Sequence, residues 1–347
     1  MSYKLLYITL LSSLLLIACS DENNIEEKSN NNSIELTFRV DNYISDRTST
    51  RATEVGSISE QLVLDLYVLL FRVGSEELIG KYHIPNAVAD GTFTGGKYNF
   101  SDKKITLNMT PASAGNCHVY IIANANINGL LPLLQGLPLN NPSTLAMFKN
   151  IVFKTIPQPW SPTITIPILM SGSSTHNFTT NTILNSIHLI RAIAKIELNI
   201  KLTSAFQGKA PATNNTSLTE YKYRYVNFDV NTYAVKPDIK IPNTVNSSNA
   251  GWPNSADWIP WGATLNSSPN PPDVGAGYNT DSAGKVTELR LTTYVNERDE
   301  AGAMIEIELP RIDSGPLPPP EFGPELYKLP LPKKIERNNW YRYDIEI

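Results

Sequence analysis

The chain has 347 residues, of which 41% are hydrophobic, and its 29 basic and 33 acidic residues give a formal net charge of −4. This length is enough for two domains of ordinary size. The low and nearly balanced charge gives no basic surface for nucleic acid and no polybasic patch for a membrane, so neither kind of electrostatic partner is expected.

The first 18 residues have the pattern of a signal peptide. Lys4 supplies a basic start, and residues 5–18 are almost all apolar. This stretch is shorter than the roughly 20 residues that a membrane-spanning helix needs, but it suits a signal-peptide core. Its end, Leu16-Ile17-Ala18-Cys19, resembles the lipobox of bacterial lipoproteins, which implies cleavage between Ala18 and Cys19 and a lipid on Cys19. The alternative is an ordinary signal peptide with a coincidental cysteine.

Residues 19–33 follow the leader and are rich in Asp, Glu, Asn and Ser. Such a segment cannot bury enough apolar surface to order itself, so it predicts a solvated tether between a membrane and the fold. Its acidic start, Ser20-Asp21-Glu22, resembles that of Bacteroidetes lipoproteins displayed on the cell surface. The resemblance implies a location at the outer membrane.

Beyond the tether, the sequence predicts strands. Apolar and polar residues alternate in four segments, which gives each one buried and one solvated face: 34–40, 194–202, 305–309 and 341–347. Residues 62–71 and 119–123 are apolar on both faces and predict buried strands. Only residues 130–137 and 142–149 look briefly helical, and Pro, Gly, Asn and Ser turns separate the rest.

This pattern predicts an all-β protein with two tandem sandwiches. The polar stretch 177–185 is the natural boundary, which gives an N-terminal domain of residues 34–185 and a C-terminal domain of residues 186–347.

No set of residues in the sequence predicts catalysis. His83, His118, His176 and His188 are scattered, without the spacing of a metal site. With Cys19 used for lipid, Cys117 is a lone thiol in an apolar run, and it is expected to be buried rather than reactive. Glu297, Asp299 and Glu300 around Arg298 predict a solvated loop. We therefore expect neither an enzyme nor a cofactor.

Five blocks of sequence resemble the fimbrillin family of Bacteroidetes. They are VYIIANAN (119–126), IPILMSG (166–172), LIRAIAKIEL (189–198), YVNE (294–297) and IERNNWYRYDIEI (335–347). Arg51-Ala52 also stands where that family often has Arg-Ala. The resemblance covers most of the chain from residue 34 and implies two transthyretin-like β-sandwich domains, export as a lipoprotein, and assembly into a surface fimbria.

The resemblance also implies a route of maturation. Fimbrillins are cut by an arginine-directed protease that removes the lipidated N-terminus with its first strand, and a strand of a neighbouring subunit fills the groove. Here that strand would be residues 34–43, with Ile34, Leu36, Phe38 and Val40 as its buried face. The segment 45–54 is expected to be an exposed linker that can be cut between Arg51 and Ala52, with Arg47 as the alternative site. The other possibility is that the strand stays in place.

The end of the sequence favours a tip or accessory subunit. Residues 340–347 look like the last strand of the domain itself, so no spare donor strand is visible. The alternative is a permanently anchored surface lipoprotein that binds glycans or serves as a fimbrial anchor.

A tip subunit calls for an adhesive surface, and residues 252–277 are the candidate. Trp252, Trp258 and Trp261 stand there among Asn, Ser, Pro and Gly, and their rings could stack on sugars of a glycan or contact a protein receptor. The alternative is that these tryptophans pin a long loop onto the sandwich.

Overall fold

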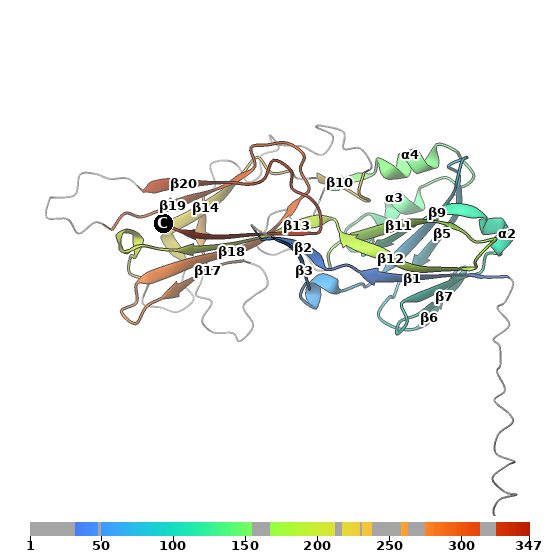
Figure 1. Ribbon diagram of the computed structural model, residues 1–347, viewed down its shortest axis with the longest axis horizontal. Coiled ribbons are helices and arrows are strands. Elements are labelled where there is room, and N and C mark those ends of the chain that lie inside the picture. The colour runs from blue at the N-terminus through green and yellow to red at the C-terminus, as the bar shows by residue number, and fades with distance from the viewer. Residues whose placement is uncertain are drawn as a thin grey trace, which may run out of the picture.

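Alternating apolar residues produce strands along most of the chain, and this confirms the all-β prediction. The computed structural model describes residues 32–47, 50–154, 167–211, 217–229, 231–237, 258–262, 275–312 and 324–347. The predicted leader, Ala18, Cys19 and all but the last two residues of the tether lie outside this part. The strands gather into two halves that lie end to end (Figure 1).

The N-terminal half is a sandwich built from one nine-stranded sheet. One layer contains β5 (Leu78–Ile84), β4 (Leu66–Arg72), β9 (Asn116–Ala123) and β11 (Met170–Asn177). The other contains β12 (Ile183–Arg191), β1 (Ile34–Val40), β8 (Lys104–Leu107), β7 (Gly96–Asn99) and β6 (Gly91–Phe93). The layers are joined where Met170 and Ser171 of β11 pair with Arg191 and Ile190 of β12. Beyond these pairs the two strands diverge, and the apolar core fills the space between the layers.

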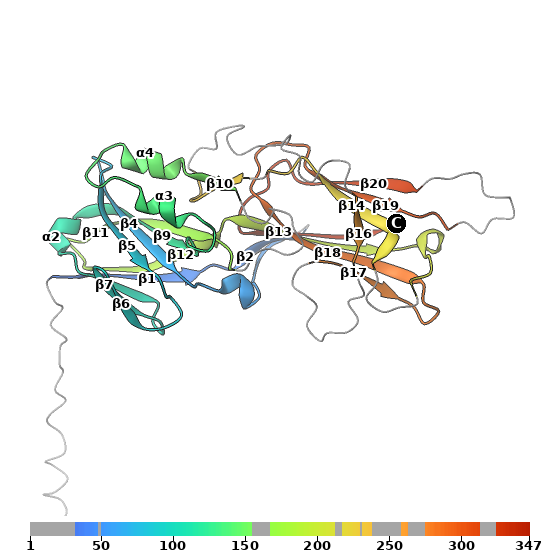
Figure 2. The same cartoon turned by 180° about the vertical axis from the view of Figure 1, so that it is seen from behind.

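Short helices cover the outer face of the first layer. α3 (Leu131–Gln135) and α4 (Thr144–Lys149) confirm the two predicted helical stretches, and Figure 2 shows them from behind. Leu134 and Phe148 of these helices pack on Leu69 and Ile122 in a second core. β4 and β9 are therefore buried on both faces, as their continuous apolar runs predict. α2 (Pro111–Ala114) and the 3₁₀ turn η1 (Ser59–Gln61) complete the helical elements described in this half.

The predicted strand 62–71 begins four residues later than expected, at Leu66. Asn124, at φ 66°, accepts a hydrogen bond from Leu64 N at 2.8 Å and donates to Leu62 O at 2.9 Å and Ile168 O at 2.7 Å. This side chain takes the place of a strand partner for residues 62–64 and holds them out of the sheet.

The C-terminal half is a sandwich of two sheets. The larger contains β17 (Gly275–Thr280), β18 (Val286–Asn296), β13 (Ile193–Lys201), β21 (Asn339–Glu346), β2 (Tyr43–Arg47) and β3 (Thr50–Glu54) in that order. The smaller contains β16 (Ile259–Trp261), β14 (Leu218–Val226), β19 (Met304–Leu309) and β20 (Glu325–Pro330). Their inner faces form a single apolar core. The short turn η2 (Ser204–Phe206) follows β13.

The predicted domain boundary after residue 185 falls inside β12. This strand stays paired with β1 and β11 until Arg191, and β13 starts in the other sheet at Ile193, so the chain changes halves at Ala192. Two other connections cross between the halves. β1 belongs to the N-terminal sandwich while β2 belongs to the C-terminal one, and β10 (Val152–Lys154) pairs with β15 (Asn231–Tyr233).

Gly172 stands where β11 and β12 separate. A Cβ atom built there would lie 2.1 Å from the backbone oxygen of His188, a distance that no side chain tolerates. We therefore expect Gly172→Ala to force the strands apart and to lower the free energy of unfolding by about 1–3 kcal/mol.

Thermal unfolding followed by circular dichroism checks this prediction, with an expected fall of several degrees in the midpoint. Ser173→Ala, at the next and exposed position of the same strand, is the matched control and should leave the midpoint unchanged. Equal midpoints for the two variants would contradict the packing argument.

Candidate functional site

β1 lies inside its sheet rather than at an edge. It pairs in parallel with β12 through residues 35–40 and antiparallel with β8 through residues 34–37. Ile34 and Leu36 are fully buried and Phe38 is 5% exposed, as predicted, but Val40 is only half buried. The chain leaves the sheet at Val40, so the predicted strand 34–43 is in fact two strands, β1 and the start of β2.

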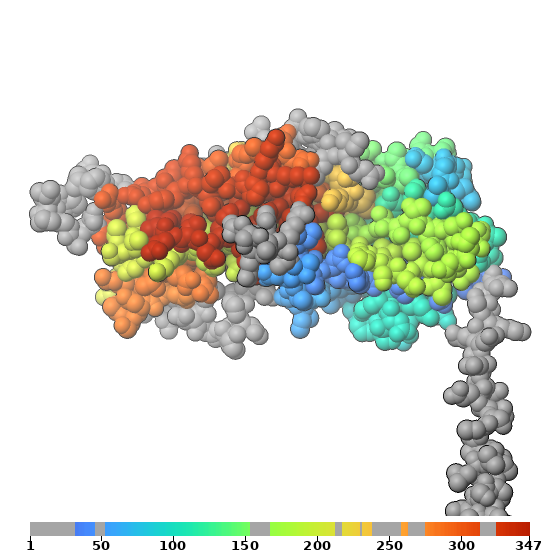
Figure 3. All heavy atoms as spheres, viewed as in Figure 1, coloured from blue at the N-terminus to red at the C-terminus, as the bar shows by residue number. Residues whose placement is uncertain are grey.

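Within residues 45–54, where the sequence predicted a linker, residues 45–47 and 50–54 belong to two paired strands. β2 pairs in parallel with β21, through Ile44 opposite Asn339, and antiparallel with β3. In this hairpin Arg51 stands opposite Asp46 and Ala52 opposite Ser45. β3 is the edge strand of the sheet, so the Arg51–Ala52 peptide bond lies in an edge strand. Figure 3 shows blue residues from the start of the fold between the two halves.

The residues between β1 and β2 are held by a cluster that we call the Arg191 site: Glu60, Arg191, Lys195, Tyr294, Asn338 and Trp340. Arg191 is fully buried, and its Nη1 donates to Asp41 O and Asn338 Oδ1, both at 2.8 Å. Asn338 Nδ2 donates to Asn42 O at 2.7 Å. The Arg191 guanidinium carbon lies 4.1 Å from the centre of the Tyr43 ring. We call the part of the fold that precedes the Arg51–Ala52 bond, with β1 and β2, the first segment. It thus crosses between the halves beside a buried cation.

Glu60 is the negative charge of the Arg191 site. Its carboxylate lies 3.2 Å from Lys195 Nζ and accepts hydrogen bonds from Tyr43 Oη at 3.1 Å, from Tyr294 Oη and from Ser57 N. Burial alone would raise the pKa of Glu60, but the attraction of Lys195 and the hydrogen bonds of Tyr294 and Ser57 outweigh it, so this pKa lies below its ordinary value. Glu60 is therefore ionised at neutral pH and compensates Lys195.

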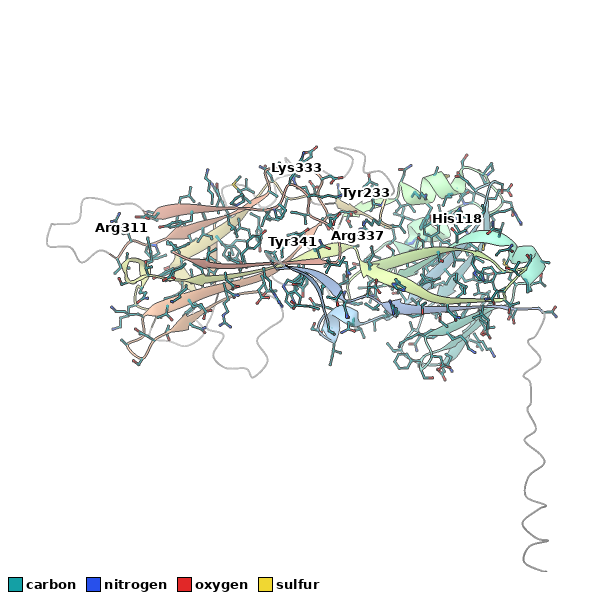
Figure 4. All side chains as sticks on the ribbon, viewed as in Figure 1. His118, Tyr233, Arg311, Lys333, Arg337 and Tyr341 are labelled. Atoms are coloured by element: carbon teal, nitrogen blue, oxygen red, sulfur yellow. The ribbon has the colours of Figure 1, made fainter. Side chains whose placement is uncertain are left out.

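A second buried group of charges lies at the same junction. Arg298 pairs with Asp229 at 2.6 Å, and Arg337 forms a two-pronged ion pair with Glu297 while donating to Tyr233 O at 3.1 Å. Figure 4 shows Arg337 and Tyr233 between the halves. Glu297 and Arg298 are 3% and 5% exposed, so the prediction of a solvated loop is wrong for both residues. The reason is that Arg337 and Asp229 come from distant parts of the sequence.

Comparisons with known proteins agree with this architecture. Residues 34–220 match the family of the major fimbrial subunit protein FimA, and residues 192–346 match the C-terminal family of the minor fimbrium tip subunit MfA4. The minor fimbrium tip subunit MfA4 of Porphyromonas gingivalis is 47% identical over 348 aligned residues, which cover 100% of both chains. The chain belongs to the fimbrillin family. The C-terminal match begins at Ala192, where the structure changes halves.

A solved structure shares the fold of this fimbrillin at low sequence identity. A Parabacteroides distasonis protein described as a candidate cell adhesion protein is 15% identical and superposes with a TM-score of 0.52, covering 90% of this chain and 88% of that one. At this identity the likeness extends to the fold alone.

The tryptophans of the predicted adhesive loop have different surroundings in this fimbrillin. Trp261 is fully buried, packs against Tyr223 at 4.9 Å between ring centres and donates to Arg290 O at 2.9 Å. It therefore belongs to the core and offers no face to a sugar. Trp258 is half buried, with the Arg224 guanidinium 4.5 Å from its ring centre. Trp252 lies outside the described residues.

The histidines and the cysteine of the fimbrillin have separate side-chain contacts, although Cys117 of β9 and His176 of β11 stand opposite each other in the sheet. His118 contacts Thr175, His176 contacts Asn181 O, and His188 lies 3.2 Å from Asp41. Cys117 is fully buried, and burial raises the pKa of its thiol to about 12. Among the described residues, no cluster of three or more His, Cys, Asp or Glu side chains could hold a metal ion. Within the same residues, no helix has the length and apolarity to cross a membrane.

Sequence reasoning missed the Arg191 site. Lys195 lies on the polar face of an alternating strand and Arg191 follows an apolar run, so neither pattern signals a buried charge. The available signal was the set of fimbrillin blocks, because LIRAIAKIEL supplies Arg191 and Lys195, YVNE supplies Tyr294, and IERNNWYRYDIEI supplies Asn338 and Trp340.

Glu60→Gln would leave Lys195 buried opposite a neutral amide. We expect this change to lower the free energy of unfolding at pH 7 by about 3–5 kcal/mol. Because the folded-state pKa of Glu60 is lowered, its contribution is present above the unfolded-state value of 4.5 and is lost as the pH falls through the lower folded-state value. The wild type should therefore lose more stability on acidification than the variant.

Urea unfolding of both proteins at pH 7 and again at a pH below about 4, under the ordinary carboxyl pKa, measures this difference. Glu346→Gln is the control, since the Glu346 side chain is 62% exposed and lies 3.9 Å from Lys201, a geometry that contributes little. Parallel pH profiles for the wild type and Glu60→Gln would show that Glu60 does not stabilise the fold as a carboxylate.

Proposed function

We propose that this fimbrillin is a tip or accessory subunit of a cell-surface fimbria, matured by cleavage after Arg51 and joined to its neighbour by donor-strand exchange. The observation that carries the proposal is the position of β1 between β12 and β8. An internal strand that precedes a cleavage site leaves a groove with two open edges when it is removed.

The apolar side chains of β1 make this groove a strong binding site. Ile34, Leu36 and Phe38 are almost completely buried, and each contributes about 1.5–3 kcal/mol by burial. Their sum is comparable with the net stability of a whole domain. A subunit that loses β1 is therefore unstable until another strand with the same alternation fills the groove.

Cleavage after Arg51 would remove more than β1. β2 also precedes this bond, so the released segment includes a strand from each half of the molecule. β3 would lose β2, its neighbour in the sheet, although Glu54 keeps an ion pair of 2.6 Å with Arg342. The replacement must accordingly fill two successive positions, beside β12 in one half and beside β21 in the other.

Two observations support a tip or accessory role. The 47% identical relative is a minor fimbrium tip subunit. In addition, β21 lies between β13 and β2 within its own sheet, so residues 339–346 cannot serve as a donor for a neighbour without opening the C-terminal sandwich. A subunit of this kind accepts a strand and presents the rest of its surface to its surroundings.

In this proposal the lipid on Cys19 is a temporary tether. It brings the subunit to the outer membrane, where an arginine-directed protease separates residues 19–51 from the fold. The function is structural, and the partners are other fimbrial subunits together with a receptor of glycan or protein nature.

One observation favours the alternative of a permanently anchored lipoprotein. The Arg51–Ala52 bond lies in a paired strand, and a protease needs an extended and accessible substrate. The hairpin must open before the bond can be cut. If it stays closed, the lipid remains attached and the chain is an anchored surface protein.

Digestion of the lipid-free protein, lacking residues 1–19, with an arginine-specific protease separates these possibilities. We expect one dominant product that begins at Ala52, because an edge hairpin opens more readily than the internal strands. Arg51→Ala should abolish that product, whereas the matched variant Arg47→Ala should leave it unchanged.

Mass spectrometry of the intact products identifies the site. A product beginning at Thr48 would move the site to Arg47. Resistance of the folded wild type under conditions that cut an unfolded control would favour the permanently anchored form.

A further inference from the structure

The Arg191 site is built from residues that all follow Arg51, whereas the groups that fill it precede Arg51. Asp41 and Asn42 supply backbone oxygens to Arg191 and Asn338, and Tyr43 supplies its ring and hydroxyl. We propose that the emptied Arg191 site recognises an aromatic residue, preferably tyrosine, in the strand donated by the neighbouring subunit. This inference rests on the proposed strand exchange and adds a specificity element to it.

Tyr43 shows what the site accepts. It is fully buried, and its ring packs edge-on to Trp340 with 5.7 Å between ring centres. The Arg191 guanidinium lies over one face at 4.1 Å, and the hydroxyl donates to Glu60 at 3.1 Å. An aromatic face attracts a cation, and a hydroxyl at this position satisfies a buried carboxylate. Aliphatic residues offer neither interaction.

Arg191 needs an occupant because its charge is buried. No carboxylate is paired with it among the described ion pairs, and its Nη2 has no hydrogen-bond partner in that part of the chain. Its remaining contacts are the Glu60 backbone oxygen at 3.0 Å, Asn338, Asp41 O and the Tyr43 ring. Two of these four leave with the first segment, and a buried cation that loses its partners is strongly unfavourable.

The walls of the site are fixed by the fold rather than by the first segment. Asn338, at φ 60°, is held by a hydrogen bond from its backbone N–H to Ile193 O at 2.7 Å. Gly56 lies against the site so closely that a Cβ there would be 2.8 Å from Arg191 Nη2 and 3.1 Å from the Tyr43 ring. Lys195 is compensated by Glu60, and its ammonium lies 4.0 Å from the centre of the Trp340 ring. The cut therefore leaves a shaped cavity wall with an excess positive charge.

These contacts define the partner by its chemistry. It is an extended segment of another subunit that runs parallel to β12 and has bulky apolar residues at alternate positions. An aromatic residue must follow five positions after the last deeply buried apolar residue, as Tyr43 follows Phe38. The two residues before it must offer their backbone oxygens. The first of them must also donate its backbone N–H, as Asp41 does to Leu189 O at 2.9 Å, so proline is excluded at that position.

A peptide of residues 34–47 of this chain serves as the probe. The Arg47→Gln protein is cut after Arg51, so that residues 20–51 remain bound without a covalent link, and the labelled peptide then displaces them. We expect the Tyr43→Ala peptide to dissociate at least about tenfold faster than the wild-type peptide, and Tyr43→Phe to stay within about threefold of it. Tyr43→Leu should behave like alanine, because leucine keeps the apolar bulk without the ring.

The matched control is Phe38→Ala in the same peptide. It weakens binding in the N-terminal groove and should do so equally on wild-type and Arg191→Gln protein. The difference between the wild-type and Tyr43→Ala peptides, in contrast, should fall below about threefold on Arg191→Gln. If the Tyr43→Leu peptide dissociates from the wild-type protein as slowly as the wild-type peptide does, the site recognises only the size of the side chain. That result overturns the inference, while strand exchange stands. If no peptide binds, wild type included, strand exchange itself fails and the inference with it.

Discussion

The buried cation of Arg191 is the interaction on which the arrangement of the two halves depends. It lies at the last residue of β12, next to the point where the chain passes to the other sandwich. It bonds to the first segment through Asp41, to η1 through the Glu60 backbone oxygen and to the end of the chain through Asn338. A charge in such a place is stable only when all its neighbours are present, so it fixes β1, η1, β12 and β21 relative to one another.

The sequence predicted the strands well because buried and exposed side chains alternate along most of them. The alternation in residues 34–40 and 194–202 and the continuous run 119–123 each became the expected element, since one face or both faces meet a core. Predictions based on local polarity failed at the junction. Lys195, Glu297 and Arg298 look solvated in sequence, but each is buried because its partner, Glu60, Arg337 or Asp229, is brought to it by the topology. The same limitation explains the hairpin around Arg51, whose pairing with β21 is a contact between the two ends of the fold.

The first segment has two roles that oppose each other, one in folding and one in the proposed assembly. It completes both sandwiches, so the newly made subunit folds on its own strands and keeps its buried charges satisfied. In the proposed assembly, its removal would create the affinity for a neighbour. The pairing of the hairpin would decide between these two roles. Its strength sets how often the hairpin opens and exposes the Arg51–Ala52 bond while the rest of the molecule stays folded. Under that proposal, one proteolytic event would separate folding and assembly in time.

The placement of β1 between two neighbours also determines how a fimbrial joint would respond to force. Backbone hydrogen bonds of a sheet run across the strands, so a pull along the strand direction loads every bond of β12 and β8 on the inserted strand at the same moment. Peeling from an edge would break the same bonds one after another at a much lower load. A strand held on both sides and pulled lengthwise is the arrangement that withstands shear, which suits a filament exposed to flow.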